Sequence, residues 1–338
     1  MSGRRMISKL VVLAGFGLSL SWAQTLSPVA RVVSGKPWVP PRTPDGHPDF
    51  QGVWTNNTVT PFERPKGLGR KEFYSEEELA ANQKKERDRL DLNLEEGRPT
   101  EAGTADDVHY DFAQFGLDRG QAKLAWNRRT SIIAGPEGTL PPLTPEASKR
   151  LAEARAKAKG HQLDGPENNT LGARCIARPN VGPPLLPSAY NSNLQIVQGA
   201  GYVAIETEMI HDTRIIPTDG RSHIDKSIRE WYGDSVGHWE GDTLVVDTTN
   251  FTDQSPFPGA PNVHVVERLT RVDPDTILYQ FTVDDPGMWT KPWSGELPIT
   301  KIQGQIYEYA CHEANYALAN TLRGARVAEQ ESAKKAGK

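Results

Sequence analysis

The sequence predicts a mainly β protein of the α+β class: an antiparallel meander, barrel-like or strongly curved, that carries a helical, loop-rich insertion. Three observations favour this fold. From about Leu194 onward, apolar and polar residues alternate with a period of two, as in strands that bury one face. Turn signals separate these segments at short intervals, and the chain carries 26 prolines and 30 glycines. Consecutive strands joined by tight turns form a meander, which is typical of open and closed barrels.

Residues 1–23 have the three parts of a secretory signal peptide. Arg4, Arg5 and Lys9 form its positive segment. An uncharged apolar run of about 11 residues follows, shorter than the roughly 20 residues of a membrane-spanning helix. Residues 21–23 (SWA) then place small side chains where a signal peptidase cleaves. We therefore expect an exported protein, periplasmic or secreted. The general secretory route is favoured over the twin-arginine route, which the arginine pair also suits.

The charge balance of the expected mature chain excludes several classes of partner. Removing residues 1–23 takes away three of the 39 basic residues and none of the 43 acidic ones. The resulting mild acidity gives no electrostatic footprint for nucleic acid or anionic lipid. No later segment has the length and apolarity of a membrane span, so we expect a soluble protein. Export also removes nucleotide cofactors from consideration, and no cofactor is predicted.

The two cysteines, Cys175 and Cys311, both lie in the expected mature chain. In an oxidising compartment an even pair predicts one disulfide, which here closes a loop of 136 residues. The alternative is a reactive thiol at Cys311, beside His312 and Glu313. That alternative requires a reducing environment, so the disulfide is favoured.

The elements before the meander are expected in this order. Residues 24–48 form a proline-rich extended arm, and residues 49–326 form a single β-rich domain that begins with a strand over 50–55. An insertion over about 60–165 carries two helices. The first begins at the capping box Ser75-Glu76-Glu77-Glu78, and the second begins at Thr144 with proline at its first position. Residues 327–338 are expected to be a disordered tail after a short helix.

The meander itself is predicted from alternation and turns. Its expected strands are Leu194–Gln198, Tyr202–Ile216, Gly237–Glu240, Thr243–Phe251, Val263–Val272, Thr276–Asp284 and Glu296–Tyr309. The Gly241-Asp242 dipeptide predicts a two-residue hairpin turn. Asp273-Pro274-Asp275 predicts another turn.

The long strand over 202–216 supplies the candidate catalytic residues. If its alternation is unbroken, His211 projects from an apolar face, whereas Glu208, Asp212 and Arg214 lie on the opposite, polar face. His211 is then either a core histidine bonded to backbone or a general base. The three polar residues are either a cross-strand charge ladder or supporting acid and anion-binding groups.

Three aromatic residues are the candidate lining of a ligand pocket: Trp239, Tyr279 and Phe281. Metal ligation requires converging side chains, and the eight histidines are scattered singly along the chain, so no metal site is predicted. Gly233-Asp234-Ser235-Val236-Gly237 fits the nucleophile-elbow pattern, with Asp247 and His264 following it. The elbow needs a strand before the serine and a helix after it, so the segment is interpreted as a turn.

Six stretches together resemble a large family of exported bacterial proteins, common in acidobacteria and some proteobacteria, for which no activity is established. They are 129–131 (RTS), 140–147 (LPPLTPEA), 210–221 (IHDTRIIPTDGR), 238–251 (HWEGDTLVVDTTNF), 265–276 (VVERLTRVDPDT) and 307–326 (YEYACHEANYALANTLRGAR). The resemblance covers most of residues 40–326. It implies a periplasmic or secreted location and supplies no reaction, cofactor or site residue.

A second resemblance is to calycin-type barrels such as lipocalins. Gly52-Val53-Trp54 matches their first-strand Gly-x-Trp, and Arg323 is the candidate for the late arginine that packs on this tryptophan. The helical insertion after the first strand departs from the calycin pattern.

The leading hypothesis is an exported protein that binds a small apolar or aromatic molecule in a barrel-like pocket. The first alternative is a periplasmic hydrolase or lyase on the same scaffold, with His211 as base, Asp212 or Glu208 nearby and Arg214 holding an anionic group. The second alternative is an envelope interaction module, which predicts a large exposed apolar patch and no concave pocket.

Overall fold

The structure is a computed structural model that describes residues 38–94, 124–188, 190–257, 262–313 and 315–337. The expected signal peptide and the first part of the proline-rich arm lie outside these residues. The strands are β1 (Gly52–Thr55), β2 (Asn193–Gly199), β3 (Tyr202–Thr207), β4 (Asp212–Pro217), β5 (Asp234–Glu240), β6 (Thr243–Thr249), β7 (His264–Asp273), β8 (Thr276–Asp284) and β9 (Trp293–Lys301). The α-helices are α1 (Glu76–Leu94), α2 (Pro145–Ala158) and α3 (Tyr316–Ala336).

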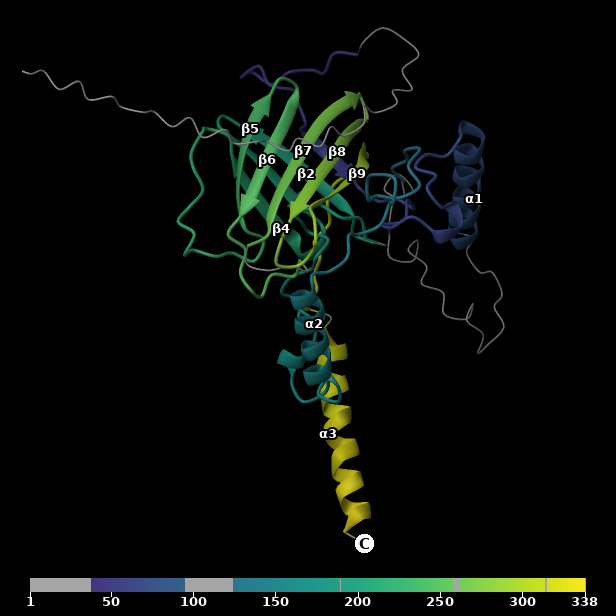
Figure 1. Cartoon of the computed structure of the whole chain (residues 1–338), viewed down its shortest axis with the longest axis vertical. Coiled ribbons are helices and arrows are strands. Elements are labelled where there is room, and N and C mark those ends of the chain that lie inside the picture. The colour runs from purple at the N-terminus through teal and green to yellow at the C-terminus, as the bar shows by residue number, and fades with distance from the viewer. Residues whose placement is uncertain (1–37, 95–123, 189, 258–261, 314, 338) are drawn as a thin grey trace, which may run out of the picture. The chain divides into compact units, whose positions relative to one another are not determined.

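The strands form a single antiparallel sheet in the order β4-β3-β2-β1-β9-β8-β7-β6-β5. Figure 1 shows the sheet curving round into a nearly closed barrel. This confirms the predicted fold class, including the antiparallel meander from β5 to β9. The first strand lies between β9 and β2, and therefore joins the meander to the β2–β4 group.

The barrel is open at one place, between the edge strands β4 and β5, which we call the seam. No strand pairing joins β4 to β5 in the part of the chain that the structure describes. The two strands nevertheless lie against each other, because a Cβ added at Gly237 of β5 would lie 2.9 Å from Ile216 Cγ2 of β4. The edges of β4 and β5 that carry no strand partner therefore face each other at the seam.

The barrel interior is filled with apolar side chains. Trp54, Tyr279, Leu297 and Ile299 are at most 1% exposed and belong to one core cluster. The insertion contributes to this core, since Ile132 and Ile133 are buried beside β9 and Ile133 bridges to Gly295. The absent side chain at Gly295 leaves room for the Phe281 ring, which would lie 2.3 Å from a Cβ there.

Trp54, the tryptophan of the Gly-x-Trp motif, has cationic neighbours, but Arg323 is not one of them. The Arg271 guanidinium lies 5.5 Å from the Trp54 ring centre and 5.1 Å from that of Trp38, and Lys301 Nζ lies 5.5 Å from Trp54. Arg323 is exposed on α3. The equivalence drawn for Arg323 is therefore wrong, because Arg271 faces inward from β7, directly beside the tryptophan.

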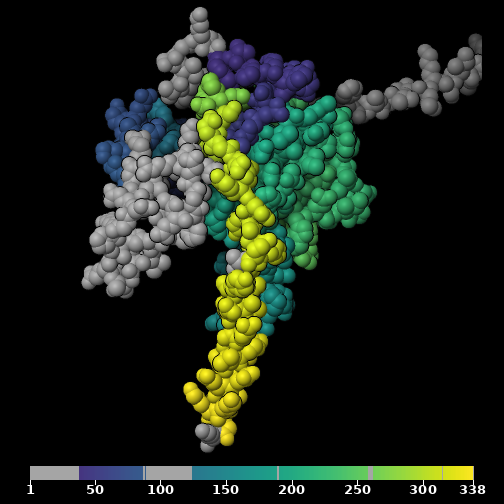
Figure 2. All heavy atoms as spheres, turned by 180° about the vertical axis from the view of Figure 1, so that it is seen from behind, coloured from purple at the N-terminus to yellow at the C-terminus, as the bar shows by residue number. Residues whose placement is uncertain are grey.

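The predicted disulfide between Cys175 and Cys311 is confirmed, with Cα atoms 5.8 Å apart. It ties the segment that follows β9, seen on the molecular surface in Figure 2, to the loop before β2. The helix α3 then continues to Ala336, so most of the expected tail is helical. Residues 327–336 are rich in alanine, glutamate, glutamine and lysine, which all favour helix.

Candidate functional site

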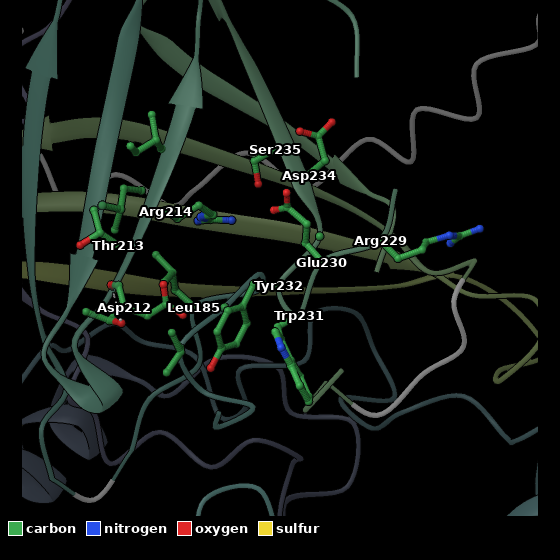
Figure 3. A pocket seen from close by; sticks show the side chains of 16 residues that line it. Leu185, Asp212, Thr213, Arg214, Arg229, Glu230, Trp231, Tyr232, Asp234 and Ser235 are labelled. Carbon is green, nitrogen blue, oxygen red and sulfur yellow. Dashed lines mark hydrogen bonds between the residues drawn. The ribbon is translucent and has the colours of Figure 1, made fainter. Parts of the chain in front are cut away.

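A cavity of about 540 Å³ lies at the seam, and we call it the seam cavity. It is lined by Val181, Gly182 and Leu185, by Ile205 and Thr207 of β3, by residues 212–215 of β4, and by residues 229–235, which lead into β5. Figure 3 shows these side chains from close by. The volume lies within the roughly 300–1,000 Å³ typical of small-molecule sites. The lining combines apolar side chains with a few charged ones.

The charged residues of β4 reach this cavity because the expected long strand is broken. Residues 208–211 form a turn, with Ile210 at φ 65° and His211 at φ 62°, and Thr207 pairs with Asp212 across the hairpin. Residues that pair across two strands lie on the same face of the sheet. The inward residues of β3 have odd numbers, and they pair with even-numbered residues of β4, which therefore also face inward. The expectation of unbroken alternation through 202–216 is therefore wrong, and Asp212 and Arg214 line the cavity.

Arg214 is held at the cavity floor by a buried partner. Its Nη1 and Nη2 both donate to the carboxylate of Glu267 on β7, the second at 3.0 Å. The Glu267 side chain is 0% exposed and that of Arg214 is 12% exposed. Burial disfavours the guanidinium charge, but Glu267 outweighs this effect and raises the pKa of Arg214. The pair therefore keeps a fixed, internally neutralised guanidinium at the floor.

Tyr279 of β8 completes this buried network. Its hydroxyl donates to Glu267 Oε1 at 2.7 Å and accepts the backbone N–H of Leu185 at 2.8 Å. Burial raises the pKa of Tyr279 well above its ordinary value, so the hydroxyl keeps its proton. Because Leu185 lines the cavity, this contact fixes the loop over 181–185 to the barrel core.

Asp212 and Tyr232 are two further polar residues that line the cavity, which Thr207, Thr213, Glu230, Asp234 and Ser235 also line. Burial raises the pKa of Asp212, against the opposing Thr213 backbone hydrogen bond and Arg214 charge. Burial also raises the pKa of Tyr232 to about 12. The Tyr232 hydroxyl is already bonded to the backbone of Arg178, with the Arg178 N–H donating at 3.0 Å. Asp212 is one of three acidic residues that line the cavity, together with Glu230 and Asp234.

The rim of the cavity is formed by residues 229–231 and by Ile215. Figure 3 shows the Arg229 side chain extending away from the cavity. Trp231 is 37% exposed and Ile215 is 63% exposed, so apolar surface continues outward from the lining. Such a rim favours the entry of a molecule with an apolar body.

His211 and Glu208 lie in the turn between β3 and β4, and neither is among the lining residues. The His211 side chain is 43% exposed, and its Nε2 lies 3.3 Å from Glu206 Oε1. Its expected position on an apolar face is wrong, because the strand ends at Thr207. Glu208 is buried, which raises its pKa, and its Oε2 has no hydrogen-bond partner among the described residues.

Of the three aromatic residues proposed as pocket lining, two belong to the packed interior and Trp239 is partly buried against it. Tyr279 and Phe281 are at most 1% exposed, with ring centres 5.6 Å apart. Trp239 stacks on His47 at a ring-centre distance of 4.5 Å. None of the three is among the residues that line the seam cavity. Tyr279 still affects the cavity, through Glu267 and Leu185.

A polar network that the sequence analysis missed covers the outer face beside the seam. His223 Nδ1 lies 2.6 Å from Asp234 Oδ2, and His223 Nε2 lies 3.0 Å from Asp247 Oδ1. His264 Nε2 lies 2.8 Å from Asp247 Oδ2. The network holds the loop before β5 against β6 and β7. The alternation of β6 and β7 could have predicted that Asp247 and His264 face outward side by side. His223 lies in a loop, where no periodic pattern predicts its position.

The nucleophile-elbow arrangement is not formed. Ser235 points inward, is 5% exposed, and its hydroxyl lies 2.8 Å from Thr248 Oγ1. Asp247 of β6 and His264 of β7 lie on the outer face of the sheet. A strand segment, β5, runs through Ser235 in place of a strand-to-helix turn.

The outer network predicts a pH dependence of stability. The Asp247 hydrogen bond raises the pKa of His264 against the effect of burial. Burial raises the pKa of Asp247, but His264 and His223 outweigh it and lower that pKa overall. The His264 contribution is therefore present below the ordinary histidine pKa of about 6.5 and lost as pH rises through the raised value. The Asp247 contribution is present above about 3.9 and lost as pH falls through the lowered value.

Asp247→Asn should consequently cost more stability at pH 5.5 than at pH 8.5. The expected cost at pH 5.5 is only about 0.5–1 kcal/mol, because both side chains are partly exposed and screened by solvent. Urea unfolding at the two pH values measures it. Asp88→Asn is the control, since Asp88 pairs with Lys84 on α1 and lysine stays charged throughout this range. Equal costs of Asp247→Asn at both pH values would contradict the assignment.

Among the described residues, no group of three or more His, Cys, Asp or Glu side chains is arranged to hold a metal ion. None of the helices in that part of the chain is long and apolar enough to cross a membrane. No protein-family model and no curated protein matches this sequence. The resemblance to an exported bacterial family therefore stays a prediction, whereas the nearly closed barrel is compatible with the calycin resemblance.

Proposed function

We propose that this protein is an exported binding protein that takes a small, largely apolar or aromatic molecule in the seam cavity. One observation carries the proposal: a cavity of about 540 Å³ at the barrel's open seam, lined by both apolar and polar residues, with a fixed guanidinium at its floor. Binding sites typically combine such an apolar wall with a few positioned polar groups. The Cys175–Cys311 disulfide supports export, because disulfides persist in oxidising compartments.

The route into the cavity follows from its position. The loop over 229–233 and the β4 edge form its rim, and the loop over 181–185 forms its inner wall. Tyr279 and Glu267 hold the inner wall and floor in place, so the cavity is largely pre-formed. Pre-formed walls reduce the ordering that binding requires.

Of the four residues proposed for a hydrolase or lyase, the structure places two at the cavity. Asp212 and Arg214 line it, whereas His211 and Glu208 do not. A general base must lie within hydrogen-bond reach of the bound molecule, and the exposed position of His211 gives no support to that role. The interaction-module alternative predicted no concave pocket, so the cavity favours small-molecule binding over it.

A fluorescence titration with prodan, an uncharged naphthalene ketone whose emission shifts to the blue in apolar surroundings, tests the proposal. We expect saturable binding that Val181→Trp weakens by about tenfold or more, because the larger side chain fills the cavity. Val197→Trp is the matched control, since Val197 is 42% exposed on β2, away from the lining.

Two results would contradict the proposed site. The first is unchanged prodan affinity in Val181→Trp, and the second is an equal loss in both tryptophan variants. Native mass spectrometry of the protein purified from its own host addresses the natural ligand. A co-purified molecule should be released from the wild-type protein and be absent from Val181→Trp.

A further inference from the structure

The chemistry at the floor of the seam cavity restricts what the cavity accepts. Arg214 of β4 lines the cavity, and its side chain is only 12% exposed (Figure 3). A guanidinium has five N–H donors, and Glu267 takes one from each terminal nitrogen. The Nε–H and the second N–H of each terminal nitrogen have no hydrogen-bond partner within the described residues. The floor therefore presents donors to a bound molecule.

The charge at the floor is already balanced. The Glu267 carboxylate is fully buried against the guanidinium, so the pair has no net charge to offer a ligand. Asp212 adds an acidic group beside it, which lines the same cavity and feels the Arg214 charge. A ligand carboxylate would lose its hydration and meet this acid without an uncompensated cation. Glu230 and Asp234 also line the cavity, so an anionic ligand would meet further acidic residues.

An uncharged oxygen acceptor fits this floor without that penalty. A carbonyl, ester or amide oxygen accepts N–H donors and carries no charge that must be desolvated. Val181, Leu185 and Ile205 form an apolar part of the wall, which suits an aliphatic or aromatic body. Glu267 fixes the orientation of the Arg214 guanidinium, and Tyr279 in turn holds Glu267, so the Arg214 donors are oriented before a ligand binds.

We infer that the seam cavity selects uncharged molecules that carry a carbonyl-type oxygen on an apolar body over anionic ones, with Arg214 as the donor and Glu267 as the residue that excludes anions. This inference rests on the proposed binding function and adds the class of ligand. It assigns a specificity role to Glu267, which does not touch the ligand and acts through Arg214.

Competition against prodan tests the inference with two probes that share a naphthalene ring. They are methyl 2-naphthoate, which is neutral, and 2-naphthoate, which is anionic. In the wild-type protein we expect the ester to compete about tenfold or more better than the carboxylate. Equal or better competition by 2-naphthoate would overturn the inference.

Two variants then locate the origin of the selectivity. Glu267→Gln leaves the Arg214 charge uncompensated and should improve 2-naphthoate binding relative to the ester by about tenfold. Asp212→Asn removes the neighbouring acid without altering the buried network, and should shift the same ratio by about threefold to fivefold. If Glu267→Gln does not fold, the Asp212→Asn variant alone tests the inference.

Glu206→Gln is the matched control, because it removes one acidic charge from β3 at a position that does not line the cavity. The ratio of its affinities for methyl 2-naphthoate and 2-naphthoate should equal that of the wild-type protein. An unchanged ratio in Asp212→Asn, or an equal shift in Glu206→Gln, would overturn the inference while prodan binding still supported the proposed function. Failure of prodan to bind at all would overturn both.

Discussion

Glu267→Ala is expected to lower the free energy of unfolding by about 3–5 kcal/mol, one of the two largest effects predicted for this protein. The substitution leaves the Arg214 guanidinium buried without its counter-ion and removes the acceptor of the Tyr279 hydroxyl. Urea unfolding followed by circular dichroism measures the loss. Because Tyr279 also holds Leu185, the cavity wall over 181–185 should become more accessible to proteolysis.

The double variant Arg214→Met/Glu267→Leu separates charge burial from lost packing. It removes both charges and should recover most of the stability, leaving a cost of about 1–2 kcal/mol from the unpaired tyrosine hydroxyl. The exposed pair of Glu240 and Arg268 supplies the matched control, and Glu240→Ala should cost under about 1 kcal/mol. Equal costs for Glu267→Ala and Glu240→Ala would contradict the buried-pair description.

Removing the disulfide is the second large effect. The double variant Cys175→Ala/Cys311→Ala opens a loop with a sequence separation of 136 residues, which spans every strand from β2 to β9. In the chain-entropy model the bridge restricts the unfolded chain and contributes about 4–5 kcal/mol. Denaturant unfolding of the variant measures this contribution.

Chemical reduction provides an independent check on the same bridge. Treating the wild-type protein with dithiothreitol should lower its unfolding midpoint to that of the double alanine variant. The double variant itself should not respond to the reductant. A wild-type midpoint unaffected by reductant, with both thiols shown to be free, would contradict the role given to the bridge.

The meander was predictable because its signals are local. The Gly241-Asp242 turn joins β5 to β6, and the alternation over 276–284 matches β8 to the residue. Such strands are specified by a period of two and by residues that suit tight turns. The disulfide followed from cysteine number and expected compartment, without knowledge of the fold.

The seam cavity was not predictable from the sequence, because it depends on the turn over 208–211. The alternating pattern on both sides of this turn predicts one continuous strand. Residues 202–216 read as a single strand, since both halves alternate. Only the turn at Ile210 and His211, both at positive φ, reverses which positions face inward on β4. A one-residue change of register exchanges the two faces of a strand. That change brought Arg214 inside and moved His211 out.

The partners of Arg214 were beyond sequence reasoning for a second reason. Glu267 and Tyr279 lie 53 and 65 residues further along the chain, on β7 and β8, and Glu267 meets Arg214 across the interior of the nearly closed barrel. Neither carries a local signal of its role, because a buried glutamate on a strand is indistinguishable in sequence from an exposed one. Barrel closure is a property of the whole sheet.

A crystal structure of the protein with methyl 2-naphthoate tests the central claim most directly. The account predicts density for the ring between the β4 edge and the loop over 229–233, with the ester carbonyl oxygen within hydrogen-bond distance of the Arg214 guanidinium. The Arg214–Glu267 pair should remain intact in that complex. Density for the ester elsewhere on the barrel, with the seam cavity holding only water, would contradict the account.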